Sequence, residues 1–80
     1  MEKKVIVYTM PNCLYCNLVK DFLRHNDIIF TEKDVNTDIW ARHTLRGLGT
    51  TRVPIIDIEG EIVQGFDEKK LRKLLCLEKN

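Results

Sequence analysis

Residues 11–16 read Pro-Asn-Cys-Leu-Tyr-Cys and stand between an apolar run and the start of a helical pattern. The two cysteines, Cys13 and Cys16, are three residues apart, so on a helix they lie one above the other, close enough for an intramolecular disulfide. The start of a helix has unpaired N–H groups and a partial positive charge, which favour a thiolate over a thiol at Cys13. This stretch therefore predicts a redox-active pair of thiols.

The two sulfurs are expected to have different roles. A free thiol has a pKa of about 8.5, so only a few per cent of it is ionised at neutral pH. The helix dipole contributes roughly 0.3–1 kcal/mol, which lowers that pKa by about one unit at most, so hydrogen bonds from the N–H groups of the turn must supply the rest. We expect Cys13, at the exposed end of the turn, to be the nucleophile, and Cys16, one turn further in, to be the resolving thiol.

Two other uses of a Cys-x-x-Cys pair fit the sequence less well. A structural zinc site needs four ligands, usually including a second closely spaced pair, whereas His25, His43 and Cys76 are scattered singly. A permanent structural disulfide would close a loop of four residues, which removes little chain entropy, and the chain shows no secretory features. We therefore expect redox chemistry and no metal, with both histidines at or near the surface.

Length and composition describe one small domain. The chain has 80 residues and a formal net charge of +1, which gives no reason to expect nucleic acid or an acidic membrane as a partner. Only four apolar residues, 5–8, follow the charged start of the chain, too few for a signal peptide or a membrane span. Three cysteines, an odd number, suggest a reducing compartment, so we expect a cytoplasmic protein.

The first part of the chain predicts a strand, a helix and a second strand. Residues 4–8 form a β-branched and aromatic run, typical of a strand covered on both faces. A helix is predicted from residue 13 to about residue 25, with Lys20 on its solvent side, and residues 28–35 are predicted as a strand parallel to the first. The apolar stripe of this helix comprises Leu14, Leu18, Val19, Phe22 and Leu23.

The second part predicts a helix, a hairpin and a last helix. Residues 36–38 supply cap residues for a helix from 39 to about 48. Two short apolar runs within residues 50–63 flank Glu59-Gly60, the pattern of a hairpin with a tight turn. Asp67 is a suitable N-cap for the last helix. The side chains that this helix is expected to direct inward are Leu71, Leu74 and Leu75.

The predicted order is therefore β-α-β-α-β-β-α. One four-stranded mixed sheet with helices on both faces would bury every apolar stripe, which places the chain in the α/β class. A redox pair after the first strand then lies at the carboxyl edge of a strand, where open α/β sheets keep their sites. We expect Trp40 to be a packing residue and Cys76 to be a small buried hydrophobic residue of the last helix.

With these elements in place, the chain resembles the glutaredoxins, which have the thioredoxin fold. Three signatures carry the resemblance: Tyr8-Thr9 leading into Cys-Leu-Tyr-Cys at residues 13–16, then Val53-Pro54, then Gly-Phe-Asp at residues 65–67. Each is weak alone, but their order and spacing are specific, and the match runs from about Val5 to Leu75. The resemblance implies a single glutaredoxin domain over residues 1–80.

The resemblance implies that glutathione is the co-substrate and that protein disulfides and glutathione mixed disulfides are reduced. In the family, the proline matching Pro54 has a cis peptide bond, and the residue matching Val53 offers its backbone to the cysteinyl part of glutathione. The γ-glutamyl end lies near the turn matching Gly65, and the glycyl carboxylate meets cationic side chains. The glutathione contacts implied for this chain are Tyr15, Arg52, Val53, Pro54, Gly65, Phe66, Asp67 and Glu68.

Several positions depart from the family pattern. The commonest motif has Pro where this chain has Leu14, which alters the stiffness of the turn and with it the redox potential. The family often has Lys where this chain has Met10, and Thr where it has Arg52. Arg52 therefore either replaces the missing cation or is a solvated charge. Gln64 stands where the family has the first of two glycines.

Two other functions stay open. Gly65-Phe66 is similar to a feature of the small redoxins that feed ribonucleotide reductase and are recharged by thioredoxin reductase. Those usually carry Val-Gln between their cysteines and a Ser-Gly-Phe-Arg-Pro stretch, which this chain lacks. Some glutaredoxins instead hold a [2Fe–2S] cluster between two subunits through the first cysteine and glutathione. We expect a monomer whose partners are glutathione and disulfide-containing proteins.

Overall fold

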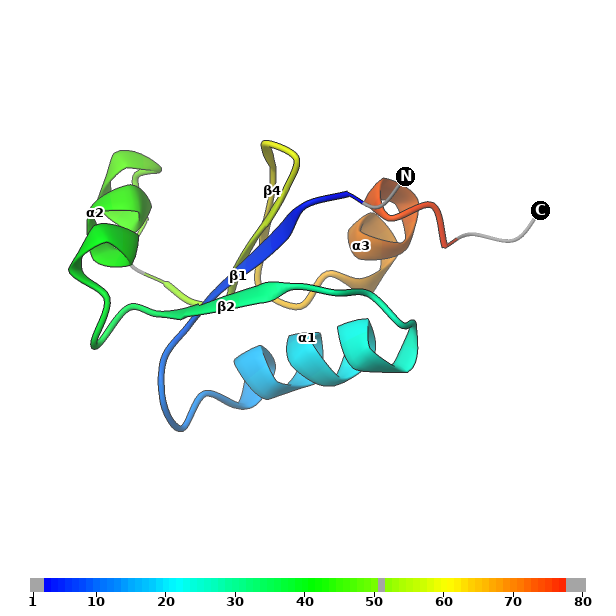
Figure 1. Cartoon of the computed structure of the whole chain (residues 1–80), viewed down its shortest axis with the longest axis horizontal. Coiled ribbons are helices and arrows are strands. Elements are labelled where there is room, and N and C mark those ends of the chain that lie inside the picture. Colours follow the sequence, from blue (N-terminus) through cyan, green and yellow to red (C-terminus); the bar gives the residue numbers. More distant parts are fainter. Residues whose placement is uncertain (1–2, 51, 78–80) are drawn as a thin grey trace.

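The computed structural model describes residues 3–50 and 52–77. It contains the seven elements expected from the sequence, in the order β-α-β-α-β-β-α (Figure 1). They are β1 (Val5–Thr9), α1 (Leu14–His25), β2 (Thr31–Asp34), α2 (Ile39–Gly47), β3 (Ile55–Ile58), β4 (Glu61–Gln64) and α3 (Glu68–Leu74). The second strand is shorter than predicted, because only four residues of the expected run pair with β1.

The four strands form one mixed sheet in the order β2-β1-β3-β4. β1 runs parallel to β2, with Val7 opposite Glu32, and antiparallel to β3, with Val7 opposite Ile56. β3 and β4 form an antiparallel hairpin whose turn residues, Glu59 and Gly60, have φ of 52° and 92°. Two successive positive φ values match the right-handed twist of the strands, so the predicted hairpin is confirmed.

Helices cover both faces of the sheet. Successive side chains along each strand point to opposite faces of the sheet, so the sheet has a separate hydrophobic core on each face. The core beneath α1 and α3 contains Val5, Val7, Val19, Phe22, Leu23, Ile56, Ile58, Val63 and Leu71. The core beneath α2 contains Tyr8, Val35, Ala41, Leu45 and Ile55. The mixed sheet with helices on both faces, predicted from the apolar stripes, is confirmed, and it is the thioredoxin-like fold that the family resemblance implied.

The buried face of α1 differs from the predicted stripe. Leu14 is 67% exposed and Leu18 is 37% exposed, whereas Cys16 and Val19 are buried. Successive residues of a helix are about 100° apart around its axis. Because the buried face of α1 includes Cys16 and Val19, the side of the helix that carries Leu14 and Leu18 is turned toward solvent. Lys20 was expected in water, but its side chain is only 17% exposed and pairs with a carboxylate of β2.

Two further predictions were wrong. Trp40 is 76% exposed rather than packed, because α2 buries the face of Ala41 and Leu45. The Trp40 ring lies against that of His43, which is also exposed, with ring centroids 6.1 Å apart. Cys76 is exposed rather than buried, because α3 ends at Leu74 and Cys76 lies on a turn with φ of 59°. His25 and His43 are both exposed, as expected.

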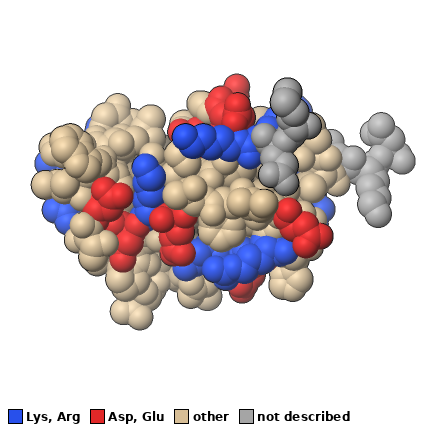
Figure 2. Space-filling model, in the orientation of Figure 1, with Lys and Arg blue, Asp and Glu red and all other residues tan. Residues whose placement is uncertain are grey.

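The surface shows no large area of one charge on the face in view. Figure 2 shows basic and acidic side chains beside one another there, in line with the net charge of +1. Within residues 3–50 and 52–77, no helix has the length and apolar character needed to cross a membrane.

Candidate active site

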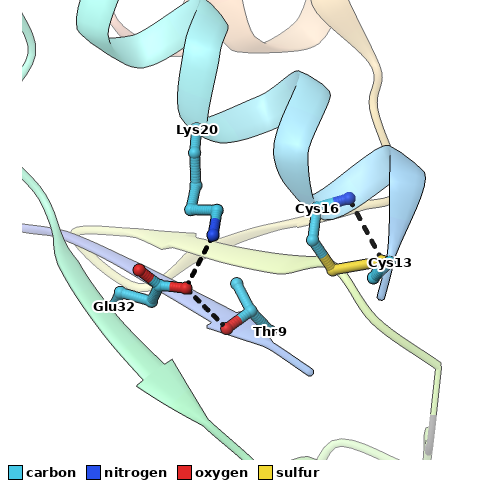
Figure 3. Close-up of a disulfide and its surroundings, with 5 residues drawn as sticks. All are labelled: Thr9, Cys13, Cys16, Lys20 and Glu32. Carbon is cyan, nitrogen blue, oxygen red and sulfur yellow. Dashed lines mark hydrogen bonds and ion pairs between the residues drawn. A yellow bond between two sulfur atoms is a disulfide. The ribbon is translucent and has the colours of Figure 1, made fainter. Parts of the chain in front are cut away.

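The site is built on the junction of β1 and α1. Cys13 is the N-cap of α1, with φ of −106° and ψ of 109°, and Cys16 lies in the first turn. The two form a disulfide with their Cα atoms 5.2 Å apart, in the usual range for such a bond (Figure 3). The backbone N–H of Cys16 donates a hydrogen bond to Cys13 Sγ at 3.1 Å. Asn12, with φ of 60°, turns the chain into this cap.

The two sulfurs have different environments. Cys16 is 1% exposed and faces the core, whereas Cys13 is half-buried at the N-terminus of α1. The first turn of α1 carries no acidic residue, and its last turn carries Arg24 and His25. The partial positive charge at Cys13 is therefore not opposed by a carboxylate of the same turn.

The segment before β3 contains the cis peptide bond implied by the family. The Val53–Pro54 bond is cis, Pro54 is fully buried and Val53 is half-buried. The backbone N–H of Gly65 donates to the carbonyl oxygen of Pro54 at 2.9 Å, and Gly65 has φ of 73°. The structure therefore brings two of the three sequence signatures, Val53-Pro54 and Gly65, into direct contact.

The remaining predicted site residues follow Gly65 or lie apart from it. Phe66 packs edge-on against Phe22 of α1, with ring centroids 5.9 Å apart. Asp67 caps α3 by accepting a hydrogen bond from the N–H of Lys70 at 3.1 Å, and Glu68 pairs with Arg72 at 2.9 Å. Among the described residues, neither the Tyr15 side chain, 60% exposed, nor that of exposed Arg52 hydrogen-bonds to the other predicted positions.

A polar cluster beside the disulfide was missed by the sequence analysis. Thr9, only 2% exposed, donates its hydroxyl to Glu32 at 3.0 Å, and Lys20 donates to the same carboxylate oxygen at 2.8 Å (Figure 3). The Lys20 hydrogen bond is the largest cause that lowers the pKa of Glu32; burial opposes it and the Thr9 hydroxyl adds to it. The only signal in the sequence was the position of Lys20, one helical turn after Cys16.

No group of three or more histidine, cysteine or acidic residues within the described part of the chain is arranged to hold a metal ion.

A Cys-x-x-Cys disulfide at the start of a helix, joined through one mixed sheet to a cis-proline segment, defines the thiol–disulfide oxidoreductases of the thioredoxin-like fold. Residues 5–63 match the family model described as glutaredoxin. The chain belongs to the glutaredoxin family and is a glutaredoxin-like thiol–disulfide oxidoreductase.

Similar proteins have comparable lengths. A glutaredoxin-like 8.6 kDa protein of the rubredoxin operon of Clostridium pasteurianum is 33% identical over 86% of this chain and 93% of its own. The glutaredoxin-like protein NrdH of Lactococcus lactis subsp. cremoris is 29% identical over 88% of this chain and 97% of its own. The crystal structure of the thioredoxin-like protein BC3987 is 42% identical, with a TM-score of 0.83 over 90% of this chain and all of that one.

Proposed function

We propose that this protein, as one domain over residues 1–80, reduces protein disulfides and glutathione mixed disulfides with electrons from glutathione. Cys13 is the nucleophile and Cys16 the resolving thiol. A monomer in the cytoplasm suits this role, because a reducing compartment returns both sulfurs to the thiol form.

The difference in exposure between the two sulfurs carries this assignment. An incoming disulfide can reach the half-buried Cys13, whereas Cys16 is 1% exposed. Once the disulfide opens, the N–H of Cys16, now 3.1 Å from Cys13 Sγ, is placed to stabilise a Cys13 thiolate. The helix N-terminus adds to the same effect.

The dithiol reaction proceeds by two exchanges. The Cys13 thiolate attacks one sulfur of the substrate disulfide, that S–S bond breaks, and the other sulfur leaves as a thiolate that takes a proton from water. Cys16, deprotonated, then attacks Cys13 Sγ and releases the second substrate thiol, which leaves the Cys13–Cys16 disulfide. Two glutathione molecules return two electrons and become glutathione disulfide.

With a glutathione mixed disulfide, Cys13 alone is sufficient. Its thiolate attacks the glutathione sulfur and the protein thiol leaves. A second glutathione then attacks the adduct, which regenerates Cys13 and forms glutathione disulfide. Val53 and Gly65 are half-buried rather than fully buried, which supports access of an extended tripeptide to this segment.

The second candidate is a redoxin recharged by thioredoxin reductase. The 29% identity with the NrdH protein of Lactococcus lactis favours it, as does the short chain that the two share. The chemistry at Cys13 and Cys16 is the same in both candidates, and only the electron donor differs.

The donor is identified by oxidising the protein and supplying NADPH with either glutathione and glutathione reductase, or thioredoxin reductase alone. We expect NADPH oxidation, followed at 340 nm, to depend on this protein in the glutathione system. Turnover only with thioredoxin reductase would replace the glutathione proposal by the redoxin one. The purified protein should also be colourless, since a brown protein would indicate an iron–sulfur cluster instead.

A further inference from the structure

Exposed apolar side chains gather around the disulfide. Of the eight large apolar side chains that the described residues expose, four lie within residues 10–18. They are Met10, Leu14, Tyr15 and Leu18. Apolar residues scattered singly over a surface need no explanation, but a group of them beside a reactive centre indicates an interaction site.

The same stretch of chain is uncharged. Residues 10–19 contain no Lys, Arg, Asp or Glu, although these four make up 31% of the chain. Figure 2 shows the loop after β1 and the start of α1, at the lower left of the view, as uncharged surface. Lys20 is only 17% exposed and pairs with Glu32, and the next charges on α1, Asp21 and Arg24, pair with each other at 3.6 Å. A partner at this corner therefore meets an apolar surface that ends at an ion pair.

Leu14 and Leu18 lie on one side of α1, because residues four apart share a helix face. The helix buries Val19 and Leu23 on its other side, and no other described element covers its outer side (Figure 1). We call these two leucines the outer strip. At a rise of about 1.5 Å per residue, Leu18 lies about 7.5 Å along the helix axis from Cys13. An extended chain advances about 3.3 Å per residue, so a side chain two or three residues from a disulfide held at Cys13 can reach Leu18.

We propose that the outer strip binds apolar side chains of a protein substrate while Cys13 attacks the disulfide of that substrate. The inference rests on the proposed function and specifies its substrate class: protein disulfides with apolar residues two or three positions from the cystine. Continuity with the reactive sulfur identifies the occupant, since Leu14 directly follows Cys13 and a disulfide brought to Cys13 lies against the start of the strip. Leu18, one turn further along α1, is then the residue that distinguishes a polypeptide disulfide from one too small to extend that far.

The test uses the symmetrical disulfides of two uncharged peptides, each with one central cysteine. One peptide has leucine at the second and third positions on both sides of the cysteine, the other has serine there, and hydroxyethyl disulfide is the small reference substrate. Reduced protein, freed of reductant, is mixed with each disulfide. Acid-quenched mass spectrometry follows the loss of two hydrogen atoms from the protein as Cys13–Cys16 forms and two thiols are released. We expect the leucine peptide to react about tenfold faster than the serine peptide, which corresponds to partial burial of one leucine side chain.

Three variants locate that preference on the outer strip. Leu18→Gln keeps a good helix former but removes the apolar side chain, so it should lower the rate constant for the leucine peptide about fivefold and leave the other two within about twofold. Leu18→Met stays apolar and should keep most of the preference. Ile29→Gln is the matched control. Ile29 is 73% exposed and precedes β2, at the opposite end of the parallel strands from Cys13, so this variant should keep the full preference.

The possible failures separate the outer strip from the proposed function. Equal rate constants for the two peptides with the unmodified protein, or an unchanged preference in Leu18→Gln, would overturn the strip as a binding surface. Equal losses in Leu18→Gln and Ile29→Gln would overturn it too, and so would equal slowing of all three disulfides in Leu18→Gln, because Leu18 would then act by holding the helix. Each of these outcomes leaves the thiol–disulfide function intact. Failure of the unmodified protein to react with any of the three disulfides would overturn both.

Discussion

At the scale of single residues, Cys13 and Cys16 share a helical turn but not an environment, since Cys16 is 1% exposed and Cys13 is half-buried. We expect Cys13→Ser to abolish exchange with every disulfide, by at least about 10³-fold, because no other accessible sulfur occupies the helix start. Cys16→Ser should retain activity toward glutathione adducts and lose it toward protein disulfides. Rates of thiol release from both substrate types measure the two effects. An active Cys13→Ser variant would reverse the assigned roles.

Glu32 is the residue whose ionisation the structure alters most clearly near the disulfide. Its pKa lies below the ordinary value because Lys20 donates a hydrogen bond to it, with a smaller lowering from Thr9. A carboxylate with a lowered pKa stabilises the folded state above its unfolded pKa of about 4.3, and this contribution is lost as the pH falls through the folded pKa. The cluster should therefore stabilise the protein at pH 7 but not at pH 3.

Glu32→Gln isolates that contribution, because the Gln carbonyl can still accept the Thr9 hydroxyl but the amide cannot accept from Lys20 as a carboxylate does. Glu32 is 40% exposed, so we expect a loss of only about 0.5–1 kcal/mol at pH 7, and almost none at pH 3. Urea unfolding followed by far-UV circular dichroism measures both. Glu68→Gln, which removes the Arg72 pair within α3, is the control for a solvated ion pair. A loss that is equal at the two pH values would show that Glu32 acts by packing alone.

At the scale of elements, the hairpin between β3 and β4 depends on its turn. Gly60 has φ of 92°, and a Cβ added there would meet no atom within 4 Å, so the cost of a side chain is purely conformational. We expect Gly60→Ala to destabilise the protein by about 1–2 kcal/mol. Gly47, in α2, also has open space around it but has no positive φ. Gly47→Ala should therefore stabilise by about 0.5–1 kcal/mol, the opposite sign.

Thermal unfolding of the two glycine variants, measured side by side, tests the turn geometry. A stabilising Gly60→Ala would show that the turn does not need positive φ at this position. A destabilising Gly47→Ala would show that the α2 helix ends earlier than residue 47.

The elements could be predicted from the sequence because local chemistry determines them. Asp38 and Asp67 cap α2 and α3 as expected, each through hydrogen bonds to backbone N–H groups, and Glu59-Gly60 forms the expected turn. The sequence predicted less accurately which side of each helix is buried. One residue shifts a helix face by about 100°, which is enough to expose Trp40 and Leu14, and ending α3 at Leu74 exposes Cys76.

The two cysteines and the cis-proline of the candidate site could be predicted from the sequence, but the polar residues beside the disulfide could not. Cys13, Cys16 and the cis bond before Pro54 were expected from the motif spacing and the family resemblance, and the structure has all three in the expected form. The Thr9, Glu32 and Lys20 cluster joins residues from three separate elements, β1, β2 and α1. Only the register of the sheet and the rotation of the helices bring such residues together, and neither can be read from spacing along the chain.

At the scale of the whole molecule, the sheet has a separate hydrophobic core on each face. The core beneath α1 and α3 contains the buried side chains of α1, the helix that carries the disulfide. α3 contributes one fully buried side chain, Leu71, to that core. Phe66, which precedes α3, packs against Phe22 of α1, so docking of α3 and the position of α1 are linked. Loss of α3 packing should therefore affect the site as well as the stability.

Leu71→Ala tests this dependence. Replacing a fully buried leucine by alanine costs about 2–5 kcal/mol, against a total stability of about 4–12 kcal/mol for a domain of this size. We expect a lower urea midpoint and, below it, faster alkylation of the reduced Cys16 thiol, because transient loss of α3 uncovers α1. Ile29→Ala, at a position 73% exposed, should change the stability by less than about 0.5 kcal/mol and leave alkylation unchanged. A destabilised Leu71→Ala whose Cys16 stays as protected as in the unmodified protein would show that α1 keeps its place without α3.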